Sequence, residues 1–244
     1  MKNLHQSEGE PASAGTSSLG KANFGLYILI FFALWTVRAT LLYPIDEAIQ
    51  AQSPAWRQVY ADTVRVIMWI APVFVYLAVV DKVAPLQFLY LKTPVDRRGL
   101  LVGGAVAVLY LACGFALTYS LAGDGQPKQI SVDVTSWQWY NILLGLPIAP
   151  LAEEILFRGF ILRKLQGFAR FWPANLATAG LFVAIHWPYW LYSQGWNTGL
   201  IAASAGIFGI GLLLGYLVRK TNSLWPSIVT HTLNNFLSVA VHVG

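Results

Sequence analysis

Two adjacent glutamates and two histidines lie inside apolar segments of this 244-residue chain. Glu153 and Glu154 belong to Leu-Ala-Glu-Glu-Ile-Leu-Phe-Arg, His186 closes Phe-Val-Ala-Ile-His, and His231 opens His-Thr-Leu-Asn-Asn, which ends at Asn235. A carboxylate and an imidazole can position and deprotonate a water molecule. A second imidazole and an amide can donate hydrogen bonds to an oxyanion. These residue types together suit a hydrolase that activates water.

Acidic residues are rare in this part of the chain. Nine of the eleven acidic residues lie at or before Asp133, and the last 111 residues contain only Glu153 and Glu154. An ionisable group inside a membrane costs a few kcal/mol and usually marks a functional site. Glu154 and Arg158 are four residues apart, so they can form a structural pair on one helix face. Glu153 then lies about 100° around the helix without a local partner, which suits a general base.

The composition indicates a membrane protein. Hydrophobic residues make up 56% of the chain and charged residues 11%, against roughly 25% charged residues in soluble domains. One soluble core would have to accommodate ten Trp and thirteen Phe. The net charge of +5 comes from basic residues that lie between apolar segments. We interpret them as orientation signals, and we expect no nucleic-acid partner. Cys113 is the single cysteine, which excludes an internal disulfide.

The predicted fold is an all-α, polytopic bundle of about seven transmembrane helices, because each span needs about 20 apolar residues. The seven apolar segments are Phe24–Tyr43, Thr63–Val80, Gly99–Ala122, Trp137–Leu165, Pro173–Leu191, Gly199–Val218 and Leu224–Val243. We expect a disordered cytoplasmic tail over residues 1–22 and helices one to three within 23–135. Residues 136–244 would form a four-helix catalytic core. No internal repeat or soluble domain is evident.

The charges of the loops predict an orientation. If the amino terminus lies in the cytoplasm, the inside segments hold eleven basic residues and the outside segments three. Cytoplasmic loops carry such an excess of Lys and Arg. The sequence therefore predicts a multi-pass cell-membrane protein with its amino terminus inside and its carboxyl terminus outside.

The depths of the polar residues point to one shared site. At a rise of about 1.5 Å per residue, Glu153 lies about 18 Å from the cytoplasmic helix end, His186 about 20 Å, His231 about 10 Å and Asn235 about 17 Å. Taken singly, an intramembrane histidine is often a helix–helix hydrogen-bonding group. One common layer instead favours a water-filled cavity among helices four, five and seven.

Two other types of site use similar residues. Glu153, His186 and His231 could hold a divalent metal such as Zn²⁺, although no His-Glu-x-x-His helix is present. The same residues could form a proton path in a transporter, although helices four to seven show no paired half-repeat. No serine or cysteine belongs to a nucleophile motif with a paired base.

The order of the motifs is similar to that of a known family. Three motifs on successive helices carry the resemblance: Glu153-Glu154-x3-Arg158, Phe182-x3-His186 and His231-x3-Asn235. They resemble the CPBP family of CAAX proteases and bacteriocin-processing proteins, also called the Abi family, which includes the Ras-converting CAAX prenyl endopeptidase. The resemblance covers roughly Pro150–Leu237.

The resemblance implies an intramembrane endopeptidase that acts without a covalent intermediate. By this resemblance Glu153 and His186 would activate water, and His231 and Asn235 would form the oxyanion hole. The second glutamate and the arginine of the first motif would support them. Family members are often labelled metalloproteases, but the family's structural picture favours direct activation of water. No cofactor is therefore assigned, and Zn²⁺ stays an alternative.

The expected partners are the lipid bilayer and a membrane-associated peptide or protein substrate. The short chain resembles prokaryotic members, which are linked with peptide maturation, bacteriocin self-immunity and membrane-protein processing. A non-enzymatic immunity or partner-binding protein is the main alternative, followed by a proton-coupled transporter. The sequence indicates neither the peptide that is cleaved nor an oligomeric state.

Overall fold

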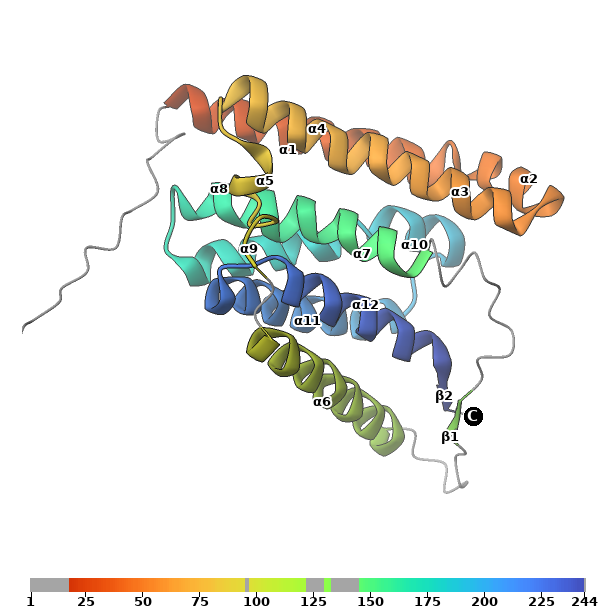
Figure 1. Ribbon diagram of the computed structural model, residues 1–244. Coiled ribbons are helices and arrows are strands. Elements are labelled where there is room, and N and C mark those ends of the chain that lie inside the picture. Colours follow the sequence, from red (N-terminus) through yellow and green to blue (C-terminus); the bar gives the residue numbers. More distant parts are fainter. Residues whose placement is uncertain (1–17, 95–96, 122–129, 133–144, 244) are drawn as a thin grey trace, which may run out of the picture.

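The computed structural model describes residues 18–94, 97–121, 130–132 and 145–243. Nearly all of these residues are helical, and the long helices lie side by side with alternating chain direction (Figure 1). The predicted helical architecture is thus confirmed, with one small addition. Strands β1 (Ile130–Val132) and β2 (Val241–Val243) pair in antiparallel register. Most of the predicted tail lies outside the described residues, and the first helix begins at Ser18.

Helices occupy the positions of all seven predicted spans. They are α1 (Ser18–Thr40); α3 (Pro54–Arg65), η1 (Val66–Ile70), α4 (Ala71–Val75) and η2 (Tyr76–Val80); α6 (Arg97–Leu121); α7 (Leu146–Glu154), η4 (Ile155–Ile161) and α8 (Leu162–Gln166); α9 (Phe171–Ala184) and α10 (Trp187–Gln194); α11 (Gly199–Thr221); and α12 (Trp225–Ala240). The short helices α2 (Tyr43–Gln52) and α5 (Pro85–Phe88) lie in connections.

Membrane-spanning capacity is clear for three of these helices. Among the described residues, Ser18–Thr40, Pro54–Val80 and Gly199–Thr221 are long and apolar enough to cross a membrane. This places the protein in the membrane. The full count of seven spans and the four-helix core stay predictions, and residues 133–144 of the fourth predicted span lie outside the described residues.

The fifth predicted span is not continuous. The sequence predicts one helix over Pro173–Leu191, but α9 ends at Ala184 and α10 begins at Trp187. Pro188 lies in the first turn of α10 and has no N–H to donate to the preceding turn. The helix therefore breaks at Ile185 and His186, which places His186 at the amino-terminal cap of α10.

Aromatic rings join the amino-terminal helices to η4. Phe160 of η4 packs edge-to-face on Phe24 and Tyr27 of α1, with ring centroids 5.7 and 5.1 Å apart. It also packs on Tyr76 of η2 at 5.2 Å. Such pairs contribute about 0.5–1.5 kcal/mol beyond the burial of their area. The segment just after the two glutamates is thus held by several neighbouring helices.

Small residues let α11 approach α9 closely. A Cβ atom on Gly215 would lie 1.9 Å from Oδ1 of Asn175, and one on Gly211 would lie 3.2 Å from the Cβ of Ala179. The two glycines are four residues apart, the spacing of tightly packed membrane helices. Asn175 Nδ2 donates a hydrogen bond to the carbonyl oxygen of Leu212 at 3.0 Å. This contact places α11 against the helix that leads to His186.

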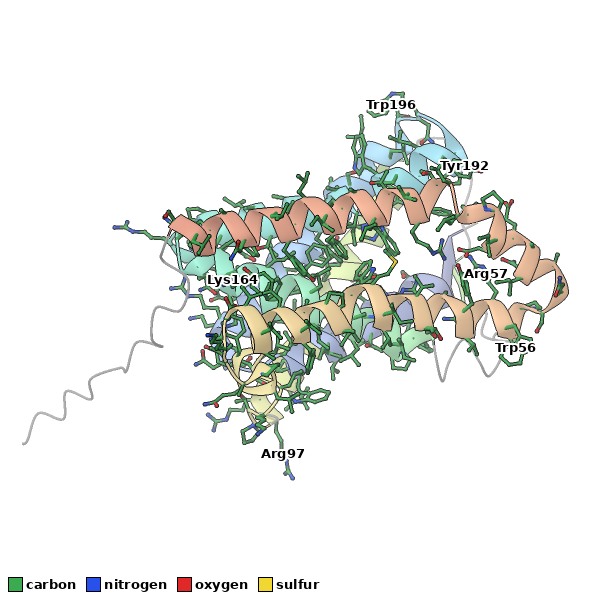
Figure 2. The ribbon with its side chains drawn as sticks, turned by 90° about the horizontal axis from the view of Figure 1, so that it is seen from above. Trp56, Arg57, Arg97, Lys164, Tyr192 and Trp196 are labelled. Carbon is green, nitrogen blue, oxygen red and sulfur yellow. The ribbon has the colours of Figure 1, made fainter. Side chains whose placement is uncertain are left out.

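The two ends of the bundle differ in chemistry. Figure 2 shows Arg97 and Lys164 at one end, and Trp56, Arg57, Tyr192 and Trp196 at the opposite end. Interfacial Trp and Tyr and an asymmetric distribution of basic residues are typical of membrane proteins. The bundle therefore has a basic end and an end rich in aromatic residues.

Candidate active site

The carboxylate of Glu154 is the centre of a fully buried polar cluster. Its side chain and that of Arg158 are both 0% exposed. Arg158 donates to Oε1 at 2.7 Å, His231 Nδ1 donates to the same oxygen at 2.8 Å, and Ser227 donates to Oε2. The i, i+4 pair predicted from the sequence is therefore present, but Glu154 also binds two residues of α12. Its donors occupy both oxygens, so this carboxylate serves as an anchor for other side chains.

Arg158 ties this cluster to the helices around it. Its second terminal nitrogen donates to the carbonyl oxygen of Gly211 on α11 at 3.2 Å. Its guanidinium group also lies over the ring of Phe182 on α9, 4.2 Å from the centroid. A buried cation over an aromatic face is stabilised by the quadrupole of the ring. One arginine of η4 thus contacts residues of α7, α9 and α11.

His231 lies between the two glutamates. Its Nδ1 atom is held by Glu154, and its Nε2 atom is 3.5 Å from Oε2 of Glu153. Because an ionised carboxylate only accepts hydrogen bonds, Nδ1 carries a proton. A neutral ring with its proton on Nδ1 keeps a lone pair on Nε2, whereas a doubly protonated ring donates from both nitrogens. In that state the ring is a hydrogen-bond donor at the side facing Glu153.

Glu153 is the more accessible of the two glutamates. Its side chain is 13% exposed, against 0% for Glu154. Its carboxylate lies 3.5 Å from the Nε2 atom of His231. The two adjacent glutamates therefore differ in environment, because one is saturated with donors and the other keeps acceptor capacity.

His186 has its ring fixed by the helix that precedes it. Nδ1 lies 2.9 Å from the carbonyl oxygen of Phe182. A carbonyl oxygen only accepts, so Nδ1 is the donor and the neutral ring keeps its lone pair on Nε2. His186 lies within electrostatic range of Glu153 and His231. The two histidines thus have different chemistry, since one donates to a carboxylate and the other to a neutral carbonyl.

Phe182 packs against both imidazole rings. Its ring is edge-to-face with His186 at 5.4 Å and with His231 at 5.7 Å, both at 89°. Because Arg158 lies over the same ring, this one side chain contacts three of the polar residues. The sequence motif contained Phe182 but gave no reason for its presence. The structure supplies one, because the ring packs against both histidines and limits their rotation.

Asn235 has fewer contacts than the other predicted site residues. It lies one turn after His231 on α12, and its Oδ1 atom accepts a hydrogen bond from Asn234 Nδ2 at 3.5 Å. Its own Nδ2 group makes no hydrogen bond with the described residues, so this donor is available to a ligand. The structure thus places His231 beside Glu153, and the ring of Phe182 contacts both His231 and His186. The contacts of Asn235 give it no fixed place among them.

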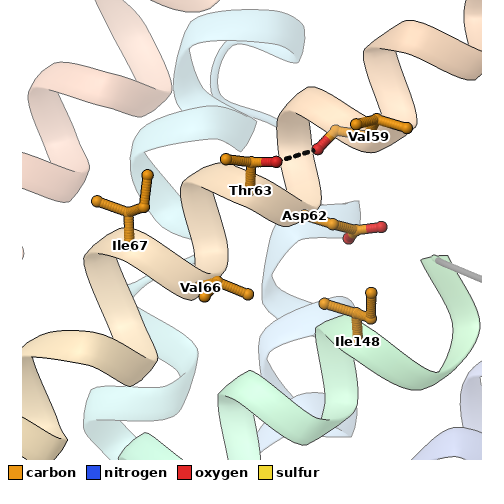
Figure 3. Close-up of a pocket in the computed structure, with 6 residues that line it drawn as sticks. All are labelled: Val59, Asp62, Thr63, Val66, Ile67 and Ile148. Carbon is orange, nitrogen blue, oxygen red and sulfur yellow. Dashed lines mark hydrogen bonds between the residues drawn. The ribbon is translucent and has the colours of Figure 1, made fainter.

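A separate cavity lies on another side of α7. It has a volume of about 320 Å³ and is lined by Val59, Asp62, Thr63, Val66, Ile67 and Ile148 (Figure 3). Ile148 and Glu153 are five residues apart, which places them about 140° apart around a helix. Val66 and Ile67 are exposed on the outer surface of the bundle. None of the proposed catalytic residues lines this cavity, so it is distinct from the site around Glu153.

Glu153, His186 and His231 are residue types that bind metal ions, but their arrangement does not suit a metal site. Both histidines have Nδ1 fixed by an acceptor, as metal-binding histidines usually do. Within the part of the chain that the structure describes, however, no three His, Cys, Asp or Glu side chains are close enough to hold a metal ion. The arrangement of Glu153, His186 and His231 therefore does not fit a Zn²⁺ site as it stands.

Comparison with known proteins identifies the family of the carboxyl-terminal half. Residues 135–237 match the model of the Rce1-like type II CAAX prenyl endopeptidases. This segment belongs to that family, which confirms the resemblance drawn from the three motifs. The family is one of proteases, and all the side chains of the cluster described above lie within the matched residues.

Two similar bacterial proteins have no function in their names. The uncharacterized protein YyaK of Bacillus subtilis (strain 168) is 31% identical over 103 residues, which are 41% of this chain and 32% of that protein. The match therefore spans about a third of its length. An uncharacterized 24.3 kDa protein of Escherichia coli is 29% identical over 203 residues, which are 79% of this chain and 90% of that protein. No solved structure matches the chain.

The buried cluster predicts a large effect of Arg158→Ala. Loss of the guanidinium would leave the carboxylate of Glu154 buried without its cation, which should destabilise the bundle by about 3–5 kcal/mol. Expression and the melting temperature in detergent should both fall. The double variant Glu154→Gln/Arg158→Ala should recover part of the loss, because the uncompensated charge is also removed. Wild-type melting of Arg158→Ala would contradict this account of the cluster.

Proposed function

We propose that this chain is an intramembrane endopeptidase that hydrolyses a peptide bond in a membrane-associated peptide or protein. The observation that carries the proposal is the contrast between the two adjacent glutamates. Glu154 is saturated with donors and fully buried, whereas Glu153 is partly exposed and faces Nε2 of His231 at 3.5 Å. The match of this segment to a family of proteases supports the same conclusion.

Glu153 and His186 would activate the water. In the proposed step the carboxylate of Glu153 takes one proton of a water molecule while the water oxygen attacks the carbonyl carbon of the substrate. Nε2 of His186 would accept a hydrogen bond from the other proton of that water. When the C–N bond breaks, the proton on Glu153 passes to the leaving amine, which regenerates the carboxylate. No bond forms between enzyme and substrate.

His231 and Asn235 would stabilise the tetrahedral oxyanion. The hydrogen bond from His231 Nδ1 to Glu154 leaves Nε2 facing the reacting atoms, and in this proposal the ring is doubly protonated, so that Nε2 donates to the oxyanion. The Nδ2 group of Asn235, one turn away on the same helix, would be a second donor. Donors that are aimed at developing negative charge in a water-poor site are worth several kcal/mol of transition-state stabilisation. Ser227 and Arg158 would act through Glu154 by fixing His231.

We further propose that the basic end of the bundle faces the cytoplasm and that residues 136–244 form the catalytic core. The positions of Arg97 and Lys164, opposite the aromatic end, support this orientation (Figure 2). Single cysteines in a Cys113→Ser background provide the test. A cysteine at Lys82 should resist an impermeant maleimide added to intact cells, and one at Trp196 should react. The reverse pattern would overturn the orientation.

Substitutions at the four proposed catalytic residues should separate their roles. Purified wild type would be assayed with a peptide library, with cleavage detected by mass spectrometry. Glu153→Gln and His186→Ala should each lower kcat by about 10²–10⁴-fold, because a positioned general base contributes that much. His231→Ala and Asn235→Ala should lower kcat by about 10²–10³-fold and leave KM nearly unchanged, because each removes a donor to the transition state.

The melting temperatures of these variants serve as the control for folding. Cleavage that survives in both Glu153→Gln and His186→Ala would overturn the mechanism. A wild-type protein that cleaves nothing in the library, but shows substrate flux in liposomes that Glu153→Gln abolishes, would instead establish a transporter. Asn235→Asp is a matched variant, because it keeps the shape of the side chain and removes the Nδ2 donors.

Direct activation of water by Glu153 and His186 predicts that cleavage does not depend on a metal ion. Elemental analysis of active protein should find no stoichiometric zinc, and activity should persist after prolonged dialysis against a chelator. The opposite result would be about one equivalent of zinc per protein, with activity that falls when the zinc is removed and returns when zinc is added. That result would show that a metal ion takes part in activating the water.

A further inference from the structure

The helix break beside His186 leaves a backbone carbonyl that a residue of α1 satisfies. In a continuous helix the carbonyl oxygen of Ile185 would accept from the N–H of Tyr189. That N–H lies in the first turn of α10, whose donors have no intrahelical partner. Nε1 of Trp35 instead donates to the Ile185 oxygen at 2.8 Å. The bond joins residues 150 positions apart in the chain.

This bond acts on the backbone of His186 itself. The carbonyl of Ile185 and the N–H of His186 belong to one planar peptide unit. The N–H side of that unit donates to the carbonyl oxygen of Val183 at 3.0 Å, and the C=O side accepts from Trp35. The plane from which the His186 side chain projects is therefore held at both edges. Inside a bilayer an unsatisfied carbonyl costs several kcal/mol, so this arrangement is strongly preferred.

Trp35 is itself fixed by an aromatic chain that returns to the site. Its ring packs edge-to-face on Trp69 of η1 at 4.8 Å, and Trp69 packs on Phe157 of η4 at 6.2 Å. Phe157 packs on Phe182 at 5.0 Å, and Phe182 contacts the ring of His186. His186 is thus held through its backbone by Trp35 and through its ring by Phe182. Trp35 and Phe182 belong to the same aromatic cluster, in which Trp69 and Phe157 connect them.

Residues near the aromatic end add a second link between these elements. Tyr43, the first residue of α2, packs on Tyr189 and Tyr192 of α10 with ring centroids 5.2 and 5.6 Å apart. The hydroxyl groups of Tyr43 and Tyr189 are 3.5 Å apart. The helix that follows His186 is therefore attached to the amino-terminal helices at both its beginning and its middle.

We propose that Trp35 is a positioning residue for His186. Helix α1 would then contribute a residue that supports the active site. The inference rests on the proposed function, since it assigns Trp35 a role in positioning His186 beside the water. It extends the site beyond the family-matched residues 135–237 to a helix that carries none of the three motifs. Loss of the indole donor would let the Ile185–His186 peptide rotate and move the His186 side chain.

Trp69 provides a matched control for the test. It belongs to the same aromatic cluster and is 1% exposed, but its Nε1–H has no hydrogen-bond partner among the residues that the structure describes. Trp35→Phe removes an indole donor that is bonded to Ile185, whereas Trp69→Phe removes one that is not. Trp69 is the more buried residue, so its substitution should cost at least as much stability. An effect on His186 should follow only from Trp35→Phe.

Two readouts keep the inference separate from the proposed function. Hydrogen exchange by mass spectrometry in detergent should show faster exchange over residues 183–190 in Trp35→Phe than in wild type or Trp69→Phe. In the peptide assay Trp35→Phe should lower kcat by about 10-fold to 10²-fold with KM nearly unchanged, because small displacements of a catalytic group have effects of this size. Trp69→Phe should keep kcat within about twofold.

Three results would overturn the inference. The first is exchange that is unchanged in Trp35→Phe, and the second is exchange that rises equally in both variants. The third is faster exchange over residues 183–190 together with a wild-type kcat. If the wild-type protein cleaves no peptide, the proposed function fails, and the exchange comparison alone decides whether Trp35 holds the break.

Discussion

A buried ion pair inside an apolar bundle is the interaction on which the site depends. Glu154 and Arg158 are both fully buried, and neither charge would be tolerated there without the other. Arg158 reaches Gly211 and the ring of Phe182, and Glu154 reaches His231 and Ser227. The segments α7, η4, α9, α11 and α12 therefore meet at one pair of charges. The low polarity of the surroundings makes each of these bonds strong and each missing partner expensive.

The arrangement separates the work of two identical side chains that are adjacent in the sequence. Because successive residues on a helix point about 100° apart, one carboxylate is directed into the interior of the bundle and the other toward its more open part. The interior carboxylate fixes the proton on Nδ1 of His231. The other carboxylate keeps the capacity to accept a proton. The same residue type thus serves as an anchor and as the proposed base because its surroundings differ.

Local patterns in the sequence predicted the helices and the pair of charges. Apolar runs of about 20 residues located the helices, and the spacing of Glu154 and Arg158 was enough to predict their contact. The break before α10 was missed, although Pro188 indicated it. The apolar run Pro173–Leu191 continues through the break, so its length alone predicts one helix, and only the missing backbone N–H of Pro188 indicates that the helix ends.

Contacts between distant parts of the chain could not be predicted in this way. Ser227 lies in an apolar helix where a hydroxyl group usually bonds its own backbone, so nothing local indicated its bond to Glu154. Phe182 is one of many aromatic residues, and only the packing of α9 shows that it contacts two histidines. The bond from Trp35 to Ile185 depends on which face of α1 meets α10, which a single sequence does not specify.

The position of Arg158 has a consequence for how the chain enters the membrane during synthesis. Four of the groups that fix the site are made in a definite order, from Glu154 and Arg158 to Ser227 and His231. Since Arg158 lies one turn after Glu154 on the same helix, the two charges can neutralise each other as soon as that helix leaves the ribosome. The other acceptor sites on Glu154 are filled only when α12 inserts beside it. A nascent chain can therefore insert Glu154 into the bilayer as one member of an ion pair, but the proposed site is incomplete until α12 has inserted.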